Sequence, residues 1–156
     1  MVYQTYLSGF GESKLDDITK LVGKQTEFVL QLFDDKSFIE DNIDNTYIKL
    51  FYKNTYVGRI IEGCNAISVI ILFVSFIVAF SGKLKQTLLY ILAGSVLIYL
   101  LNILRIVLLV VLVYNYPSEE HLLHGVLFPL IIYGIVFILW VIWVNKFSKY
   151  ASKTAK

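Results

Sequence analysis

Three long apolar runs in the second part of the sequence limit what this chain can fold into more than any other feature. They lie at about 65–81, 86–116 and 125–145, and we expect each of them to cross a lipid bilayer as a helix. The middle run is about 45 Å long at helical rise, which exceeds the roughly 30 Å of a hydrocarbon core. This run is therefore one tilted or broken helix that projects beyond the bilayer, or one span followed by a re-entrant piece.

The composition fits an integral membrane protein and argues against several other classes. Hydrophobic residues make up 57% of the chain and charged residues only 17%, whereas about a quarter of a soluble domain is charged. A single cysteine rules out an internal disulfide framework, and no Cys/His pairs stand at the spacing of zinc ligands. The sequence has no Gly-rich phosphate loop and no basic stripe interleaved with aromatic residues. We therefore expect no metal, no cofactor and no nucleic-acid partner.

The lysines set the expected orientation in the membrane. The loop at 83–85 and the tail after Asn145 share one side by helix count, and together they carry six lysines and no acidic residue. The opposite loop, 117–124, has no Lys or Arg, and we expect its two glutamates to be solvated charges on the outer face. The positive-inside rule places the C-terminus in the cytoplasm, so that the residues before the first span lie outside.

Residues 1–63 are expected to form a small α+β segment outside the membrane. Apolar spacings of three and four predict an amphipathic helix over 13–33, and the polar, acidic stretch 34–45 predicts a loop. The aromatic and β-branched residues of 46–61 predict a β-hairpin. The first residues are too short to span and lack a signal peptide's basic region, so we expect the tail of a helix whose beginning is absent. The predicted fold class is an all-α integral membrane protein, with about three transmembrane helices in residues 64–156.

The only cysteine, Cys64, lies where the polar segment becomes the first apolar run, and we expect it at the first turn of that helix. Arg105 and His124 lie at a similar depth in the other two runs. Counted from the cytoplasmic end of its own run, Cys64 is 17 residues away, Arg105 is 20 and His124 is 22. These separations correspond to about 26, 30 and 33 Å of helix. One chemically active side chain from each run thus reaches the outer interface, although the sequence does not show that the three face each other.

Each of these residues also has a plain structural interpretation. A lone cysteine is commonly a small hydrophobic residue, although a helix N-terminus and a nearby cation would favour the thiolate. Arg105 inside an apolar run points to function or an obligatory partner, with snorkelling to the interface as the alternative. His124 can be an ordinary interfacial histidine, and His121 is a rival on the same face; we prefer His124 because it directly opens the last run. Asn102, on the turn next to Arg105, either orients the guanidinium or caps a helix break.

A cysteine, a histidine and an arginine together indicate acyl transfer. The thiolate attacks a peptide carbonyl and forms a thioester, while the imidazole supplies and removes protons. The guanidinium stabilises the thiolate or the oxyanion.

The residues around these three positions resemble the exosortase/archaeosortase family of membrane cysteine transpeptidases, most closely its short exosortase F-like branch. The resemblance is carried by Glu-Gly-Cys64-Asn-Ala, Asn102-Ile-Leu-Arg105 and His124-Gly-Val-Leu-Phe-Pro at the ends of successive membrane helices. It implies that Cys64 is the nucleophile, Arg105 the oxyanion or thiolate partner and His124 the general base. Many members carry Cys-Ser-Gly where this chain has Cys-Asn-Ala, and the short branch normally begins with one more helix.

The resemblance implies an enzyme that cleaves the C-terminal sorting signal of exported proteins at the outer face of the bacterial cytoplasmic membrane. Such a signal has a short motif, a hydrophobic helix and a basic tail, so the expected partners are membrane-tethered protein substrates and the lipid bilayer. The rival interpretation is a non-enzymatic membrane partner or assembly subunit of a surface-protein export system, in which Arg105 pairs with an acidic residue of another protein. A small transporter is disfavoured, because its polar residues should lie near the membrane midplane.

Overall fold

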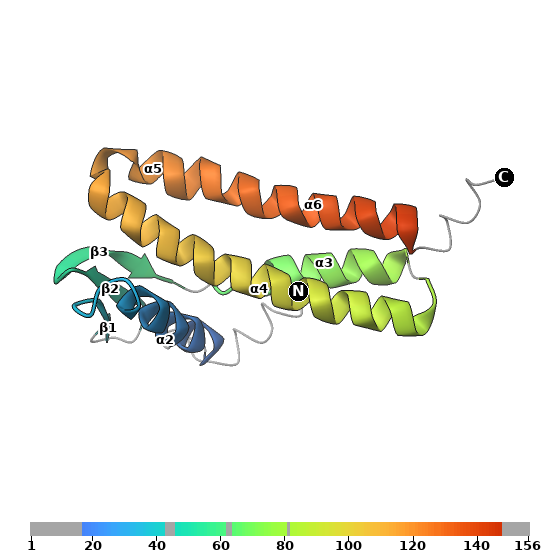
Figure 1. The fold of residues 1–156 in the computed structure, drawn as a ribbon, viewed down its shortest axis with the longest axis horizontal. Coiled ribbons are helices and arrows are strands. Elements are labelled where there is room, and N and C mark those ends of the chain that lie inside the picture. The colour runs from blue at the N-terminus through green and yellow to red at the C-terminus, as the bar shows by residue number, and fades with distance from the viewer. Residues whose placement is uncertain (1–16, 43–45, 62–63, 81, 148–156) are drawn as a thin grey trace.

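A computed structural model describes residues 17–42, 46–61, 64–80 and 82–147 of the chain (Figure 1). The chain forms a small layer of one helix and a sheet, followed by a bundle of long apolar helices. The predictions made for the first sixteen residues, for the two residues before Cys64 and for the lysines after residue 147 lie outside the described residues.

The first described element is the amphipathic helix α2 (Asp17–Gln31), which falls within the predicted range 13–33. Its buried side is made by residues at spacings of one, three and four along the helix: Thr19, Val22, Gly23, Thr26 and Leu30. This side faces the sheet and the longest helix of the bundle, which allows the short helix to bury apolar area that it could not bury alone.

The hairpin consists of β2 (Ile48–Tyr52) and β3 (Thr55–Ile60), which pair antiparallel within the predicted range 46–61. Lys53 and Asn54 form the turn with φ of 51° and 61°, the left-handed geometry that matches the twist of paired strands. Alternate residues of β2 are buried, so one face of the hairpin packs on the core.

The loop predicted over 34–45 is partly wrong, because it contains a third strand. β1 (Phe38–Asp41) pairs antiparallel with β2, and the strand order in the sheet is β1-β2-β3. The rings of Phe38 and Phe51 stack with centroids 4.6 Å apart, and the Ile39 N–H donates to the Glu27 carboxylate at 3.0 Å. None of the four strand residues is fully buried, so the sequence lacks the apolar alternation that reveals a strand.

Helices make up the remainder of the described chain, and their bounds are α3 (Ile67–Ala79), α4 (Leu84–Asn115), η1 (Pro117–Glu119), α5 (Glu120–Leu122), η2 (Leu123–Leu127) and α6 (Phe128–Lys146). Within the described residues, two helical runs are long and apolar enough to cross a membrane, namely Leu84–Asn115 and Pro117–Lys146. α3 has 13 residues and is about 20 Å long. α4 is continuous over 32 residues, so the broken or re-entrant alternative for the middle run is wrong.

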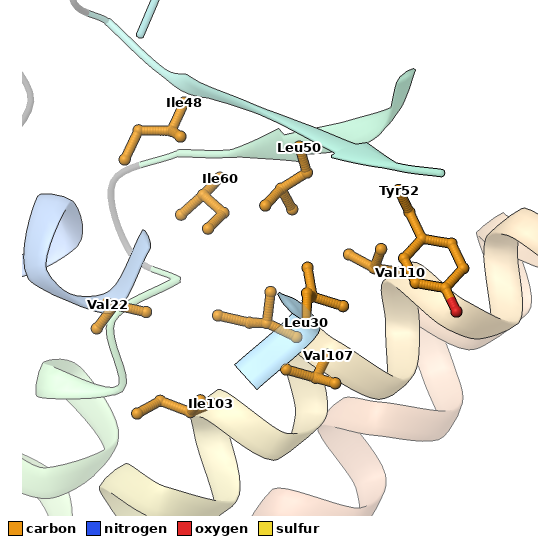
Figure 2. Packing of buried hydrophobic residues seen from close by; sticks show 10 residues of the cluster. Val22, Leu30, Ile48, Leu50, Tyr52, Ile60, Ile103, Val107 and Val110 are labelled. Atoms are coloured by element: carbon orange, nitrogen blue, oxygen red, sulfur yellow. The ribbon is translucent and has the colours of Figure 1, made fainter. Parts of the chain in front are cut away.

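α4 organises the molecule, because its two halves serve different layers (Figure 1). The first half packs on α3 and α6, where Gly94 lies directly against the ring of Phe73. The second half packs on α2 and the sheet, where Ile103, Val107 and Val110 approach the buried faces of both (Figure 2). The layer of α2 and the sheet is therefore held by the part of α4 that extends past α3.

Candidate functional site

A cavity of about 390 Å³ lies between β3, the second half of α4 and the helical segment that precedes α6. Three of the predicted site residues, Cys64, Arg105 and His124, are among the residues that line it. They come from three different segments, the turn before α3, α4 itself and η2, so the fold brings together side chains that are up to 60 positions apart (124 − 64). Asn102 does not line the cavity but donates a hydrogen bond to the Cys64 carbonyl. His121 does not line the cavity.

Cys64 lies in a turn before α3, and the prediction that it belongs to the first turn of the helix is wrong. α3 begins only at Ile67, because Ala66 adopts the left-handed conformation with φ of 60° and interrupts the chain direction. The Cys64 N–H donates to the Ile61 carbonyl at 3.2 Å, which folds the turn back on the end of β3. Asn102 of α4 donates its side-chain amide to the Cys64 carbonyl at 2.7 Å. The half-buried thiol is thus carried by a turn that is hydrogen-bonded on both sides.

Asn65 anchors the same turn to helix α2. Its side chain is fully buried, its amide donates to the Thr19 hydroxyl of α2 at 3.1 Å, and its carbonyl oxygen accepts from the Ile67 N–H at 3.2 Å. Bonding of an asparagine oxygen to the N–H two residues later is the usual way in which this residue type stabilises a turn. Asn65, which stands where many sequences of the resembling family have serine, therefore stabilises the turn and joins it to α2.

Arg105 projects from α4 into the cavity and is half-buried. Among the described residues, no carboxylate and no hydrogen-bond acceptor pairs with its guanidinium. A cation in an apolar helix that has no partner among the described residues is expensive, which favours a role towards a bound anion or a developing negative charge. Asn102 bonds to the Cys64 backbone, so neither of the two roles predicted for it, orienting the guanidinium or capping a helix break, is observed.

His124 lies in the π-helical turn η2, one turn away from His121. Pro129 has no N–H to donate to the carbonyl four residues earlier, which explains why the hydrogen-bond ladder widens at this point. The Phe128 N–H bonds to the Leu123 carbonyl instead. Both histidines are exposed, but only His124 contributes to the cavity wall. The geometry therefore favours His124 over His121 as the imidazole of the site.

Two further charged residues that sequence reasoning missed also line the cavity. Glu120, which was expected to be a solvated charge, lies four residues before His124 and so on the same side of the helical segment. Arg59 of β3 reaches the opposite wall, where its guanidinium lies 5.4 Å from the Tyr47 ring centroid. The spacing between Glu120 and His124 was visible in the sequence, whereas the location of Arg59 depends on the path of the hairpin.

The three predicted site residues stand at a common height above the lysine-bearing end of the bundle. Asn102, which contacts Cys64, is 18 residues from Leu84, and Arg105 is 21 residues from it. His124 is 22 residues from Lys146. At helical rise these separations are about 27, 32 and 33 Å, close to the thickness of a hydrocarbon core.

The cavity can accommodate acyl-transfer chemistry. A thiol, a guanidinium and an imidazole border one space, and in the described part of the chain no hydrogen bond joins these three side chains to one another. The space between them is therefore open to a bound group. No cluster of three or more His, Cys, Asp or Glu residues that could hold a metal ion is found among the described residues.

Comparison with known proteins places nearly all of the described region in one family. The model of the transmembrane exosortase family matches residues 11–145 of the chain. No curated protein and no solved structure matches it. The matched region contains every residue named above as a contributor to the cavity.

Proposed function

Because this chain belongs to the transmembrane exosortase family, we propose that it is a cysteine transpeptidase of the bacterial cytoplasmic membrane. It cleaves the C-terminal sorting signal of exported proteins at the outer face and passes the new C-terminus to an acceptor or to water. One observation carries the proposal: Cys64, Arg105 and His124 come from separate segments and line the same cavity. The exosortase F-like branch remains the expected place of the chain within the family.

In the proposed topology α3, α4 and the run Pro117–Lys146 each cross the membrane, which makes three spans with the C-terminus in the cytoplasm. Exposed lysines stand at the end where α3 meets α4 and where α6 ends, and the Trp143 indole donates to the Phe80 carbonyl at 2.9 Å there. The loop at the opposite end, 117–124, carries Glu119 and Glu120 and has no Lys or Arg. This asymmetry supports a cytoplasmic lysine end and an outward cavity.

The first chemical step forms a thioester. The Cys64 sulfur attacks the carbonyl carbon of the scissile peptide bond, and the electron pair of the C=O bond moves to the oxygen. Arg105 stabilises this oxyanion, because a positioned cation beside the developing negative charge lowers the energy of the transition state. When the C–N bond breaks, the leaving amine takes the proton that His124 received from the thiol.

The second step releases the substrate. An amine of the acceptor, or a water molecule, attacks the thioester carbon while His124 accepts its proton. The C–S bond then breaks and the Cys64 thiolate is regenerated. Glu120, one helical turn from His124, is placed to stabilise the imidazolium that exists between the two proton transfers.

The proposal is tested with a reporter, an epitope-tagged exported protein of the host that ends in a short motif, a hydrophobic helix and a basic tail. Cys64→Ser is expected to reduce its processing at least about 10³-fold, because the nucleophile is lost. Arg105→Ala and His124→Ala should also reduce processing strongly. The matched control is His121→Ala, which removes a histidine one turn away that does not line the cavity and should leave processing close to wild type.

Labelling of Cys64 in intact cells gives a second measurement. A membrane-impermeant, thiolate-selective alkylating reagent should label wild-type Cys64 rapidly near neutral pH, and more slowly in Arg105→Ala and His124→Ala. Processing that survives Cys64→Ser would overturn the enzymatic proposal. The non-enzymatic membrane partner would then be the better interpretation, with Arg105 paired to an acidic residue of another protein.

A further inference from the structure

β3 is an edge strand whose free side borders the cavity. Among the described strands, the order β1-β2-β3 gives β3 a single neighbour. The backbone hydrogen bonds of the described residues outside the regular elements include none to the outer edge of Thr55–Ile60. An edge strand presents a row of N–H and C=O groups that another extended chain can pair with.

The cavity follows the length of this edge strand and also reaches Leu50 of the neighbouring strand β2. Six consecutive residues, 56–61, line it. Successive side chains of a strand point to opposite faces, so a hollow on one face would touch only every second residue. The β-bulge opposite Leu50 and Phe51 shifts this alternation near Val57. Because the hollow touches Gly58 and Arg59 alike, it borders the edge of β3 as well as the face on which Leu50 lies. These six residues correspond to about 20 Å of strand, which is long enough for a peptide segment of similar length.

The direction of β3 leads to the nucleophile. The strand ends at Ile60, and the Cys64 N–H bonds to the Ile61 carbonyl at 3.2 Å, so the C-terminal end of β3 is the end nearest the thiol. A Cβ added to Gly58 would find no other atom within 4 Å, so the space on that side of the middle of β3 is open. The cavity thus runs from the tip of the hairpin to Cys64.

We propose that the substrate segment preceding the scissile bond binds in this cavity as a fourth strand, parallel to β3. The inference rests on the proposed function, in which the substrate enters from outside and continues into the membrane after the cut. Its chain therefore runs inwards from N to C, as β3 does. An extended peptide is a better occupant than a lipid chain, because unpaired backbone groups beside a bilayer are costly and only a peptide satisfies them in a row.

Cross-linking tests the added strand directly. Cys64 is the only cysteine, so Cys64→Ala gives a background into which Gly58→Cys, Arg59→Cys or Tyr56→Cys is introduced singly. The reporter receives one cysteine at each successive position before its cut site, and disulfide formation is measured after mild oxidation. For Gly58→Cys and Arg59→Cys, the yield should alternate with a period of two residues, with the two maxima offset by one residue. Tyr56→Cys should reach positions farther from the cut site, because the proposed pairing is parallel.

The matched control is Lys49→Cys, which lies on the inner neighbour of β3, opposite Arg59. It is one strand spacing, about 4.8 Å, farther from the added strand and should cross-link several-fold less. A flat yield, a period of three to four residues, or a Tyr56→Cys maximum nearer the cut site would overturn the inference. Equal labelling of all single-cysteine variants by a small thiol reagent establishes that their cysteines are accessible.

A second variant retains Cys64 and blocks the edge instead. Gly58→Trp is expected to reduce processing about tenfold or more while a small alkylating reagent still labels Cys64 at the wild-type rate. Gly134→Trp is the control, because Gly134 is exposed on α6 and does not line the cavity. Unchanged processing in Gly58→Trp would contradict the added strand. If processing depends on Cys64 but these tests fail, only the added strand is wrong, whereas processing without Cys64 refutes the proposed function itself.

Discussion

Asn102 is the residue on which the position of Cys64 most depends. It is only 3% exposed within α4, and its amide donates to the Cys64 carbonyl at 2.7 Å. The bond joins the turn before α3 to the middle of α4, and it leaves the thiol itself free. Asn102 is therefore a positioning residue: it holds the segment that carries the nucleophile, and it makes no contact with the reacting atoms.

Replacing Asn102 with alanine should lower both stability and processing. The Cys64 carbonyl would lose its partner in a buried environment, which costs about 1–3 kcal/mol of unfolding free energy. The turn would also become less well positioned, so we expect slower processing and slower alkylation of Cys64. Thermal unfolding in detergent and reporter processing in cells measure the two effects.

Asn115→Ala provides the comparison for Asn102→Ala. Asn115 makes a bond of the same length, 2.7 Å, but it is exposed and donates to the carbonyl of its own helix at Val111. Its loss should change stability by no more than about 0.5 kcal/mol. If Asn102→Ala and Asn115→Ala behaved alike, the role assigned to Asn102 would be wrong.

Residues with unusual chemistry for their surroundings were visible in the sequence, and residues that act through contacts were not. Cys64 and His124 stand out at the ends of apolar runs, and Arg105 stands out as a charged residue inside one. The bond of Asn65 to Thr19 joins residues 46 positions apart, and no local pattern announces it. The catalytic roles themselves remain predictions that the variants above test.

At the scale of elements, the contact between α3 and α4 depends on one glycine. A Cβ added to Gly94 would lie 2.3 Å from the Phe73 Cζ and 2.6 Å from its Cε1. Phe73 is completely buried, so its ring has no space to move into. The absence of a side chain at this position lets the two helices approach closely, as is common for helices packed within membranes.

Gly94→Ala should therefore destabilise the bundle even though alanine is the better helix former. Overpacking of this kind costs about 1–3 kcal/mol, which exceeds the roughly 1 kcal/mol gained from helix propensity. Gly134→Ala on α6 offers the same chemical change in open space and should be neutral or stabilising. Thermal unfolding of both variants in one detergent measures the difference, and equal midpoints would show that the helices can separate without cost.

Elements with a strong periodicity of apolar residues could be predicted from the sequence. Elements whose formation depends on contacts with other segments could not. The amphipathic period of α2, the hairpin and the long apolar runs are properties of local sequence. β1 exists because β2 and α2 offer it partners. The start of α3 at Ile67 depends on a left-handed Ala66, a conformation that alanine rarely adopts and that sequence patterns do not reveal.

At the scale of the whole molecule, the distance of Cys64 from the lysine-bearing end of the bundle sets the length of substrate that the proposed function requires. The thiol stands beside Asn102, about 27 Å of helix from the lysine-bearing end. In the proposed function the basic tail of the substrate stays at that end while the scissile bond reaches Cys64. A helix of about 18 residues spans this distance.

Processing should consequently peak for reporters with about 18 residues between the basic tail and the cut. Shortening or lengthening this hydrophobic segment by four residues moves the scissile bond by about 6 Å and should reduce processing clearly. Inserting the same four residues far before the motif serves as the control. If processing does not depend on the length of the hydrophobic segment, then the distance from the basic tail does not determine where the substrate is cut.

The short α3 has a consequence for the lipid around it. Its 13 residues cover about 20 Å, some 10 Å less than a typical hydrocarbon core, whereas α4 beside it covers more than the core. In the proposed topology, in which α3 crosses the membrane, acyl chains next to it would shorten or tilt to meet it, at a cost of fractions of a kcal/mol per ångström. The resulting depression in the bilayer surface would lie over the turn that carries Cys64, so that water and polar acceptors reach the thiol without crossing lipid. The same mismatch would draw the protein towards thinner patches of membrane.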